Sequence, residues 1–159
     1  MASPAASCES VELAIQTVVN NTPGLISLKP EQQQALSSFL QGRDVFGYLP
    51  TGFGKSLIYQ LAPLVLEQMG RERPIVIVIS PLVALMEDQI KEAAKFGVTA
   101  LQLGHHCDAD ILNARCSLVF GSPEAWLNTD KWRNMLGSKT YQERLFGIVV
   151  DEVHMTYKW

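Results

Sequence analysis

Apolar residues along the chain follow two different periodicities. Segments with apolar residues at helical spacing, or with proline and glycine at their ends, predict helices at 11–20, 30–41, 56–69, 82–96 and 123–127. Shorter apolar stretches predict strands at 44–49, 75–79, 99–103, 117–120 and 146–150. The stretch at 75–79 is entirely β-branched, which is typical of a strand buried on both faces, and we expect the stretch at 146–150 to be buried as well.

The order of these elements predicts an α/β fold. Strands alternate with helices along the chain, and this alternation indicates a parallel sheet covered by helices on both faces. In such sheets ligands bind beyond the carboxyl ends of the strands. The residues with the most distinctive chemistry follow the stretches at 44–49 and 146–150, which is where a ligand site is expected.

A glycine-rich segment connects the first predicted strand to a helix: Leu49-Pro50-Thr51-Gly52-Phe53-Gly54-Lys55-Ser56. Gly52 and Gly54 allow successive backbone N–H groups to point at phosphate oxygens, and the following helix adds the positive end of its dipole. We expect Lys55 to reach the β- and γ-phosphates and the Ser56 hydroxyl to bind magnesium. The general phosphate-loop pattern has glycine where Leu49 stands. A chance turn is the alternative, but the strand before and the helix after disfavour it.

An acidic segment, Asp151-Glu152-Val153-His154, follows the stretch at 146–150 directly. A carboxylate at the end of a buried strand is costly unless it meets a cation. We expect Asp151 to hold the magnesium ion and Glu152 to accept a proton from the attacking water. His154 would report the state of the γ-phosphate. A solvated strand end is the alternative for this segment alone, and the glycine-rich segment upstream favours the catalytic interpretation.

The composition is that of a globular protein, with 47% hydrophobic and 18% charged residues among 159. A net charge of −3 argues against an extensive basic surface for nucleic acid. Backbone N–H groups and helix N-termini can bind phosphates without such a surface.

The three cysteines are widely spaced, form no disulfide framework and fit a reducing intracellular compartment. A metal cluster could be imagined from His105, His106, Cys107 and Cys116. Their spacing matches no zinc-site pattern, so a polar loop is the preferred interpretation.

The two motifs together resemble those of superfamily 2 helicases and, among them, of the RecQ-like DNA helicases. In the segment 49–63, Pro-Thr-Gly-Phe-Gly-Lys-Ser is followed by Tyr-Gln and Pro, which is close to the RecQ signature. The Asp-Glu-Val-His segment fills the Walker B position, with Val153 where alanine is usual. The resemblance covers 25–159 and implies the first RecA-like lobe of a P-loop NTPase, incomplete at its carboxyl end. It leaves 1–24 as a tail and a helix.

Three further segments resemble motifs of the same family. Lys29-Pro30-Glu31-Gln32 resembles the adenine-recognition motif, with Lys29 where arginine is usual and Gln32 as the amide that reads adenine. A solvated face of the glutamine run 32–34 is the alternative from the residues alone. The resemblance assigns a role in contacting DNA to Ser80, Pro81 and Leu82 of motif Ia, to Ser122 and Pro123 of motif Ib, and to Trp159 at the start of an aromatic-rich loop. Two helices that begin at proline would explain motifs Ia and Ib equally well.

The function implied by the resemblance is ATP-dependent 3′–5′ DNA unwinding, with ATP and Mg²⁺ as ligands and single-stranded DNA or a duplex junction as partner. It also implies a second RecA-like lobe with an arginine finger, which this sequence does not contain. An RNA helicase and a non-catalytic fragment that binds nucleotide or nucleic acid are the alternatives. A small-molecule kinase is disfavoured, because no lid-like arginine cluster is evident.

Overall fold

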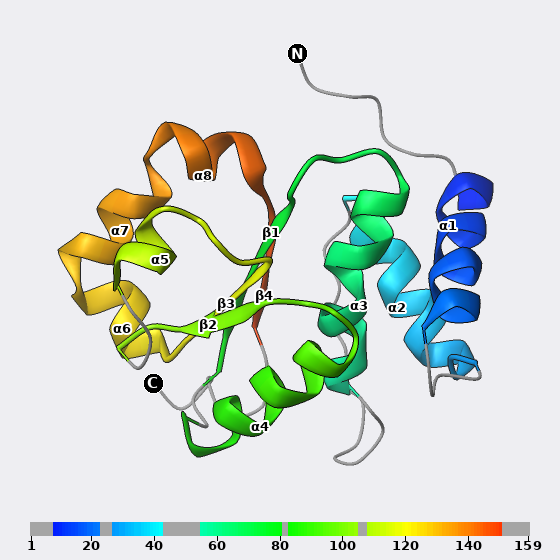
Figure 1. Ribbon diagram of the computed structural model, residues 1–159, viewed down its shortest axis with the longest axis horizontal. Helices are drawn as coiled ribbons and strands as arrows, with labels where there is room; N and C mark the ends of the chain where they lie inside the picture. The colour runs from blue at the N-terminus through cyan, green and yellow to red at the C-terminus, as the bar shows by residue number, and fades with distance from the viewer. Residues whose placement is uncertain (1–7, 23–26, 43–54, 81–82, 105–107, 151–159) are drawn as a thin grey trace. The chain divides into compact units, whose positions relative to one another are not determined.

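The computed structural model describes residues 8–22, 27–42, 55–80, 83–104 and 108–150, and the chain divides into two compact units (Figure 1). The first unit, Met1–Glu72, contains α1 (Cys8–Asn21), α2 (Pro30–Leu40) and α3 (Lys55–Gln68). The second unit, Arg73–Trp159, contains β1 (Ile75–Ile79), α4 (Val83–Lys95), β2 (Ala100–Gln102), α5 (Asp108–Leu112), β3 (Leu118–Gly121), α6 (Pro123–Asn128), α7 (Asp130–Leu136), α8 (Lys139–Arg144) and β4 (Leu145–Val150).

In the first unit, the three helices pack on one another through their apolar faces. Ile15 of α1 and Leu36 of α2 are almost fully buried, as is Leu61 of α3. Pro30 begins α2, where its missing N–H costs nothing, and Gly42 follows the helix with a φ of +82°, a conformation that favours glycine. The boundary expected between 24 and 25 stays a prediction.

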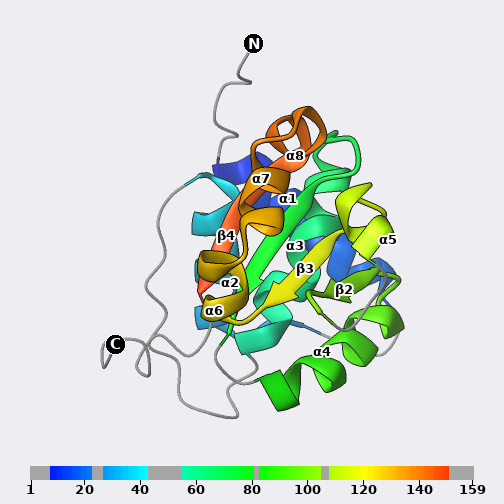
Figure 2. The same ribbon diagram turned by 90° about the vertical axis from the view of Figure 1, so that its left-hand side faces the viewer.

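In the second unit, the described strands form a four-stranded sheet in the order β2-β3-β1-β4, and each pair of neighbouring strands is parallel (Figure 2). β1 lies between β3 and β4, and its residues Ile75–Val78 are buried. The β-branched residues of this strand therefore pack on both faces of the sheet, as the sequence predicts.

Helices cover both faces of this sheet (Figures 1 and 2). Ile75 and Ile77 of β1 point into an apolar core that also contains Val119 of β3 and the side chains of Ile111, Trp126, Trp132, Met135 and Tyr141 from α5–α8. The helix α4 contacts β2 and lies on the opposite face. The prediction of an α/β fold with a covered parallel sheet is confirmed.

The amino ends of three strands are tied together by one side chain. Arg144, which directly precedes β4, donates from Nε to the carbonyl of Arg73 at 2.6 Å and from Nη1 to the carbonyl of Ala114 at 2.7 Å. Arg73 and Ala114 both have positive φ, 47° and 56°, and precede β1 and β3. The guanidinium therefore stabilises two strained turns at once.

The predicted helices and strands that fall on described residues are confirmed, with ends shifted by at most one residue except at the start of α1, which lies three residues before the predicted one. The strand predicted at 44–49 lies outside the described residues. Three short helices, α5, α7 and α8, are absent from the prediction. The expected burial of β4 is wrong, because Ile148 is 51% and Val150 is 43% exposed. Among the described strands, β4 has a neighbour on one side only, β1.

In the described part of the chain, the helices are all too short or too polar to cross a lipid bilayer.

Replacing the guanidinium should destabilise the fold. We expect Arg144→Met to lower the free energy of unfolding by about 2 kcal/mol, because two charge-assisted hydrogen bonds to carbonyls are lost. Urea denaturation followed by circular dichroism measures the change. The matched control is Arg133→Met, since Arg133 forms an exposed ion pair with Asp130. Its effect should stay within about 0.5 kcal/mol, and equal effects for both variants would contradict the role given to Arg144.

Candidate functional site

The first turn of α2 contains the two residues that the sequence assigns to adenine. The backbone N–H of Lys29 donates to Oε1 of Gln32 at 2.9 Å, so the glutamine amide is held against the start of its own helix. Gln32 is 5% exposed, whereas Gln34 is exposed to solvent. The alternative of a solvated glutamine face is therefore wrong for Gln32.

The phosphate-loop residues are only partly described. Lys55 and Ser56 are the first two residues of α3, so the helix begins one residue before the predicted start at 56. The structure describes their backbone but not the placement of their side chains. The remaining candidates for nucleotide binding, Pro50, Thr51, Gly52, Phe53 and Gly54, lie outside the described residues.

The carboxyl ends of three strands are in register. Ile79, the last residue of β1, pairs with Gly121 of β3 on one side and with Val150 of β4 on the other. The next residues along the chain are Ser80, Ser122 and Asp151. The backbone N–H of Ser80 donates to the carbonyl of Gly121 at 3.1 Å, which continues the pairing one step beyond the strands. The two serines therefore follow neighbouring strands at one edge of the sheet.

The serine after β3 also begins a helix. The Ser122 hydroxyl oxygen accepts from the backbone N–H of Ala125 at 3.2 Å, and Pro123 is the first residue of α6. Ser122 therefore caps α6, as the helix-start interpretation of motif Ib predicts. The O–H of the same hydroxyl keeps its capacity to donate. Pro123 is buried, so its role is to fix the turn rather than to offer surface.

The other predicted site residues are not described. Pro81 and Leu82 of motif Ia, the acidic residues Asp151 and Glu152, and His154 and Trp159 all lie outside the described ranges. Their roles stay predictions.

One close contact at this edge was not predicted from the sequence. Gly121 lies against the indole of Trp126, which is the fourth residue of α6. A glycine inside an apolar strand stretch is the available signal, because it often marks a close approach of another group. The sequence alone does not identify that group.

The chain belongs to the DEAD/DEAH box helicase family. The family's model matches residues 29–159, which include all the candidate site residues above. This membership confirms the RecA-like fold class inferred from the motifs.

Several curated helicases are similar to this domain. The ATP-dependent helicase SGS1 of Saccharomyces cerevisiae is 34% identical over 143 residues, covering 85% of this chain and 10% of that protein. The ATP-dependent DNA helicase Q1 of Mus musculus is 29% identical over 155 residues, covering 91% of this chain and 23% of that protein. The ATP-dependent DNA helicase Q-like SIM of Arabidopsis thaliana is 32% identical, covering 94% of this chain and 17% of that protein. The resemblance to RecQ-like helicases is thereby confirmed, and the chain spans less than a quarter of each of these three relatives.

Of the two cysteines considered for a metal cluster, Cys116 has a structural role in this helicase domain. Cys116 is 5% exposed and packs in the core beside α5–α8. Burial raises the pKa of its thiol to about 12, against a smaller lowering by the Arg144 guanidinium. A thiol that stays protonated is a poor metal ligand. No group of three metal-binding side chains occurs within the described ranges, while His105, His106 and Cys107 lie outside them. The prediction of a polar loop is wrong at Cys116, because this side chain is buried in an apolar core.

The raised pKa predicts a loss of stability at alkaline pH. The unfolded chain releases the Cys116 proton near the ordinary value of 9.0, whereas the folded chain keeps it to about 12. Between these values the unfolded state binds fewer protons, so the free energy of unfolding falls as pH rises. Urea denaturation at a series of pH values from 7 to 10.5 measures this slope.

The matched variant is Cys116→Ser, which lacks the titrating thiol. Burial also raises the pKa of Tyr141, so both proteins should lose stability above pH 9, and the wild type should lose more. In addition, a thiol reagent at pH 8 should modify Cys116 only after urea is added. Rapid modification of Cys116 in the native protein would contradict its burial.

Proposed function

We propose that this chain is the ATP-binding lobe of an ATP-dependent DNA helicase that moves 3′–5′ along single-stranded DNA. The observation that carries the proposal is the register of three strand ends, in which Ile79 pairs with both Gly121 and Val150. Residues that follow such ends share one edge of the sheet, where ligands bind in open α/β folds. The relatives named as ATP-dependent DNA helicases support the choice of ATP and DNA.

In this proposal the nucleotide is bound by the two motifs of the first unit. The loop Pro50–Ser56 would surround the phosphates with backbone N–H groups, and Lys55 would stabilise the charge that develops on the γ-phosphate. Gln32 would read adenine, because an amide can donate to one atom of the base edge and accept from its neighbour. The hydrogen bond from the Lys29 N–H supports this role, since it limits the orientations that the Gln32 amide can take.

The acidic strand end would supply the hydrolytic chemistry. Mg²⁺ prefers oxygen ligands, and the Ser56 hydroxyl and the Asp151 carboxylate are such ligands. Bound there, the ion would neutralise charge on the transferring phosphoryl group. Glu152 would accept the proton of the attacking water, and His154 would sense the γ-phosphate.

DNA would bind at the same edge through uncharged groups. Pro81 and Leu82 of motif Ia and Ser122 of motif Ib would contact the phosphate backbone, and Trp159 would begin the loop that couples this contact to hydrolysis. Ser80 and Pro123 are buried, so they would fix the turns that present these residues rather than touch the DNA. Serine hydroxyls and backbone N–H groups are common partners of phosphate oxygens and carry no sequence preference. A role in DNA repair or recombination, with a nuclear location, would fit the eukaryotic relatives.

The first test of this proposal is ATP turnover with and without single-stranded DNA. We expect the wild-type chain to bind ATP with Mg²⁺ and to hydrolyse it slowly, because an arginine finger from a second lobe is worth ~10³–10⁵ in turnover in related ATPases. Lys55→Ala should lower any turnover by about 100-fold. Lys139→Ala is the matched control, because Lys139 is exposed on α8 in the second unit.

Adding single-stranded RNA in place of DNA separates the two kinds of helicase. Stimulation by DNA but not by RNA supports the proposal, and stimulation by RNA alone would contradict it. Tight ATP binding with no turnover at saturating DNA would instead indicate a non-catalytic fragment.

A second test addresses the choice of base. We expect Gln32→Ala to weaken ATP binding by about tenfold and to leave GTP binding unchanged, because only adenine presents the edge that the amide reads. Titration with fluorescent ATP and GTP analogues measures both dissociation constants. Gln34→Ala, an exposed position on the same helix, should change neither. Equal weakening of ATP and GTP binding by Gln32→Ala would show that Gln32 stabilises α2 and does not select the base.

A further inference from the structure

Two arginines lie next to each other at the amino edge of the sheet. Ile75 and Leu145, the first residues of β1 and β4, are paired, and Arg73 and Arg144 precede them in the chain. The Arg144 guanidinium donates to the Arg73 carbonyl at 2.6 Å, so this side chain lies against the backbone of the other arginine. Burial lowers the pKa of Arg144, and the positive charge of Arg73 lowers it further. The fold therefore holds two like charges close together.

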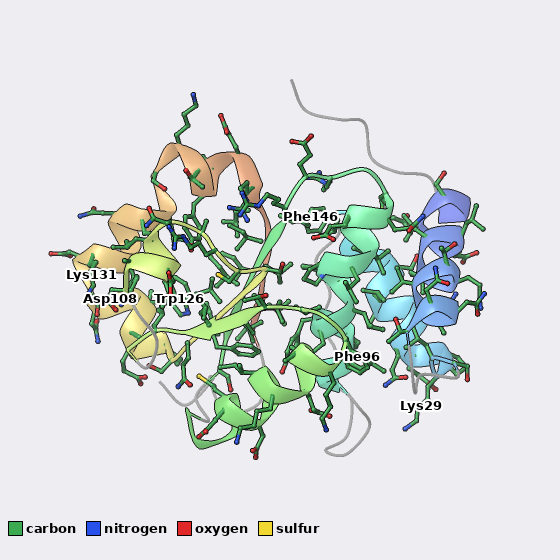
Figure 3. All side chains as sticks on the ribbon, in the orientation of Figure 1. Lys29, Phe96, Asp108, Trp126, Lys131 and Phe146 are labelled. Carbon is green, nitrogen blue, oxygen red and sulfur yellow. The ribbon has the colours of Figure 1, made fainter. Side chains whose placement is uncertain are left out.

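The two arginines have no carboxylate partner within the part of the chain that the structure describes. Glu72 and Glu143 are their sequence neighbours, but Glu72 forms no ion pair there and Glu143 pairs with Lys139 at 4.0 Å. Other basic side chains of the unit lie against acids, as Lys131 does against Asp108 (Figure 3). The chain has 16 acidic and only 13 basic residues, so acids to neutralise the pair are not scarce. The uncompensated charge suits an anion from outside the chain.

The Arg144 guanidinium also has N–H groups to spare. A guanidinium carries five, and the bonds to the carbonyls of Arg73 and Ala114 use two of them, which leaves three without a partner in the described ranges. The two bonds fix the orientation of the group, and Arg73 adds a second guanidinium at the surface. Planar groups of this kind bind phosphate oxygens through parallel hydrogen bonds.

The backbone of Arg73 supports the same interpretation. Its φ is +47°, in the left-handed region that residues with a side chain seldom adopt, and Pro74 after it favours extended backbone instead. Glycine would adopt this conformation at lower cost. Ala114, the other strained residue that Arg144 binds, is fully buried and ends in a methyl group. Arg73 instead carries a long charged side chain at the surface, and strained positions cluster at binding sites.

We propose that Arg73 and Arg144 form a phosphate-binding site at the amino edge of the sheet. This edge is opposite the strand ends where the nucleotide is expected, and the site does not depend on the proposed function. A phosphate group presents oxygens on several sides, so both guanidiniums can bind it at once, whereas the two oxygens of a carboxylate lie in one plane and suit a single guanidinium. A phosphodiester of DNA and a free phosphate ion share this chemistry, and the experiment separates the two sources.

A titration with inorganic phosphate, followed by NMR at constant ionic strength, tests the site directly. The Nε–H signals of Arg73 and Arg144 should both shift and should fit one dissociation constant. Arg73→Gly should raise that constant about tenfold at the Arg144 signal, because one charge-assisted set of hydrogen bonds is lost. The variant keeps the carbonyl that Arg144 binds, and glycine suits a positive φ, so the urea midpoint should not fall.

A second variant covers the case in which the glycine variant is unstable. Arg73→Asn is uncharged and tolerates a positive φ, so it should show the same loss of phosphate binding. An unchanged dissociation constant in the folded variants would overturn the proposal. Acetate should bind about tenfold more weakly than phosphate to the wild type. Equal binding would show a general anion site and would overturn the assignment to phosphate.

Two matched controls separate the site from general effects. Arg133→Met removes one positive charge from an exposed ion pair of the same unit and should leave phosphate binding unchanged. Ala114→Gly relaxes the other strained turn that Arg144 binds without removing a charge, and should also leave it unchanged. If either control weakens phosphate binding as much as Arg73→Gly, net charge or a loosened Arg144 explains the effect and the proposal is overturned.

A fluorescein-labelled oligothymidylate identifies the source of the phosphate. Fluorescence anisotropy at several salt concentrations measures the affinity and its dependence on salt. If DNA supplies the phosphate, Arg73→Gly should weaken binding several-fold and lower the salt slope by about 0.7, the value for one contact on a single strand. Unchanged DNA affinity together with lost phosphate binding would identify a free phosphate ion as the ligand. If the wild type binds no DNA, the proposed function is contradicted, while the phosphate titration still decides this site.

Discussion

The central strand β1 is the constraint on which the second unit depends. Its β-branched residues are buried on both faces, and its backbone is paired on both sides, by β3 and by β4. Because the backbone of β1 is shielded from water, each of its N–H and carbonyl groups needs a hydrogen-bond partner. This requirement fixes the register in which β3 and β4 pair with β1. Because Ile79 pairs with Gly121 and Val150 at once, the residues that follow all three strands are brought to one edge. The candidate chemistry of the unit is a consequence of this register.

The two ends of the sheet are stabilised in different ways. At the amino ends, Arg144 bonds the carbonyls of Arg73 and Ala114, and the Tyr141 hydroxyl donates to the carbonyl of Ile111 at 2.5 Å. These bonds join segments 30 to 71 residues apart in the sequence, so the joined segments have little freedom to move relative to one another. At the carboxyl ends, the contacts are a backbone hydrogen bond from Ser80 and the packing of an indole on a glycine. A rigid amino edge allows small groups to be positioned at the opposite edge without a dense polar network.

The sequence predicted the parts of the fold whose signal is local. The β-branched stretch of β1 and the proline start of α2 are such signals, and both elements begin at the predicted residue. The helices α5, α7 and α8 have five to seven residues, too few for a periodic pattern, and long-range contacts such as that of Tyr141 with Ile111 stabilise them. The serines and prolines that follow β1 and β3 were predicted as site residues from motifs Ia and Ib. The packing of Trp126 on Gly121 was not, because it depends on where α6 lies over β3.

The charge of the domain indicates what kind of DNA contact it can make. Its net charge is −3, and many of the described basic side chains already face acids, as in the pairs Lys131–Asp108, Arg133–Asp130 and Arg115–Asp110. Affinity from counterion release requires free lysines and arginines near phosphates. A domain with few of them must rely on hydroxyls and backbone N–H groups, which are short and cannot reach across a misplaced strand end. Such contacts tolerate little positional error, and this is why the register set by β1 matters more to the proposed function than the charge of the surface.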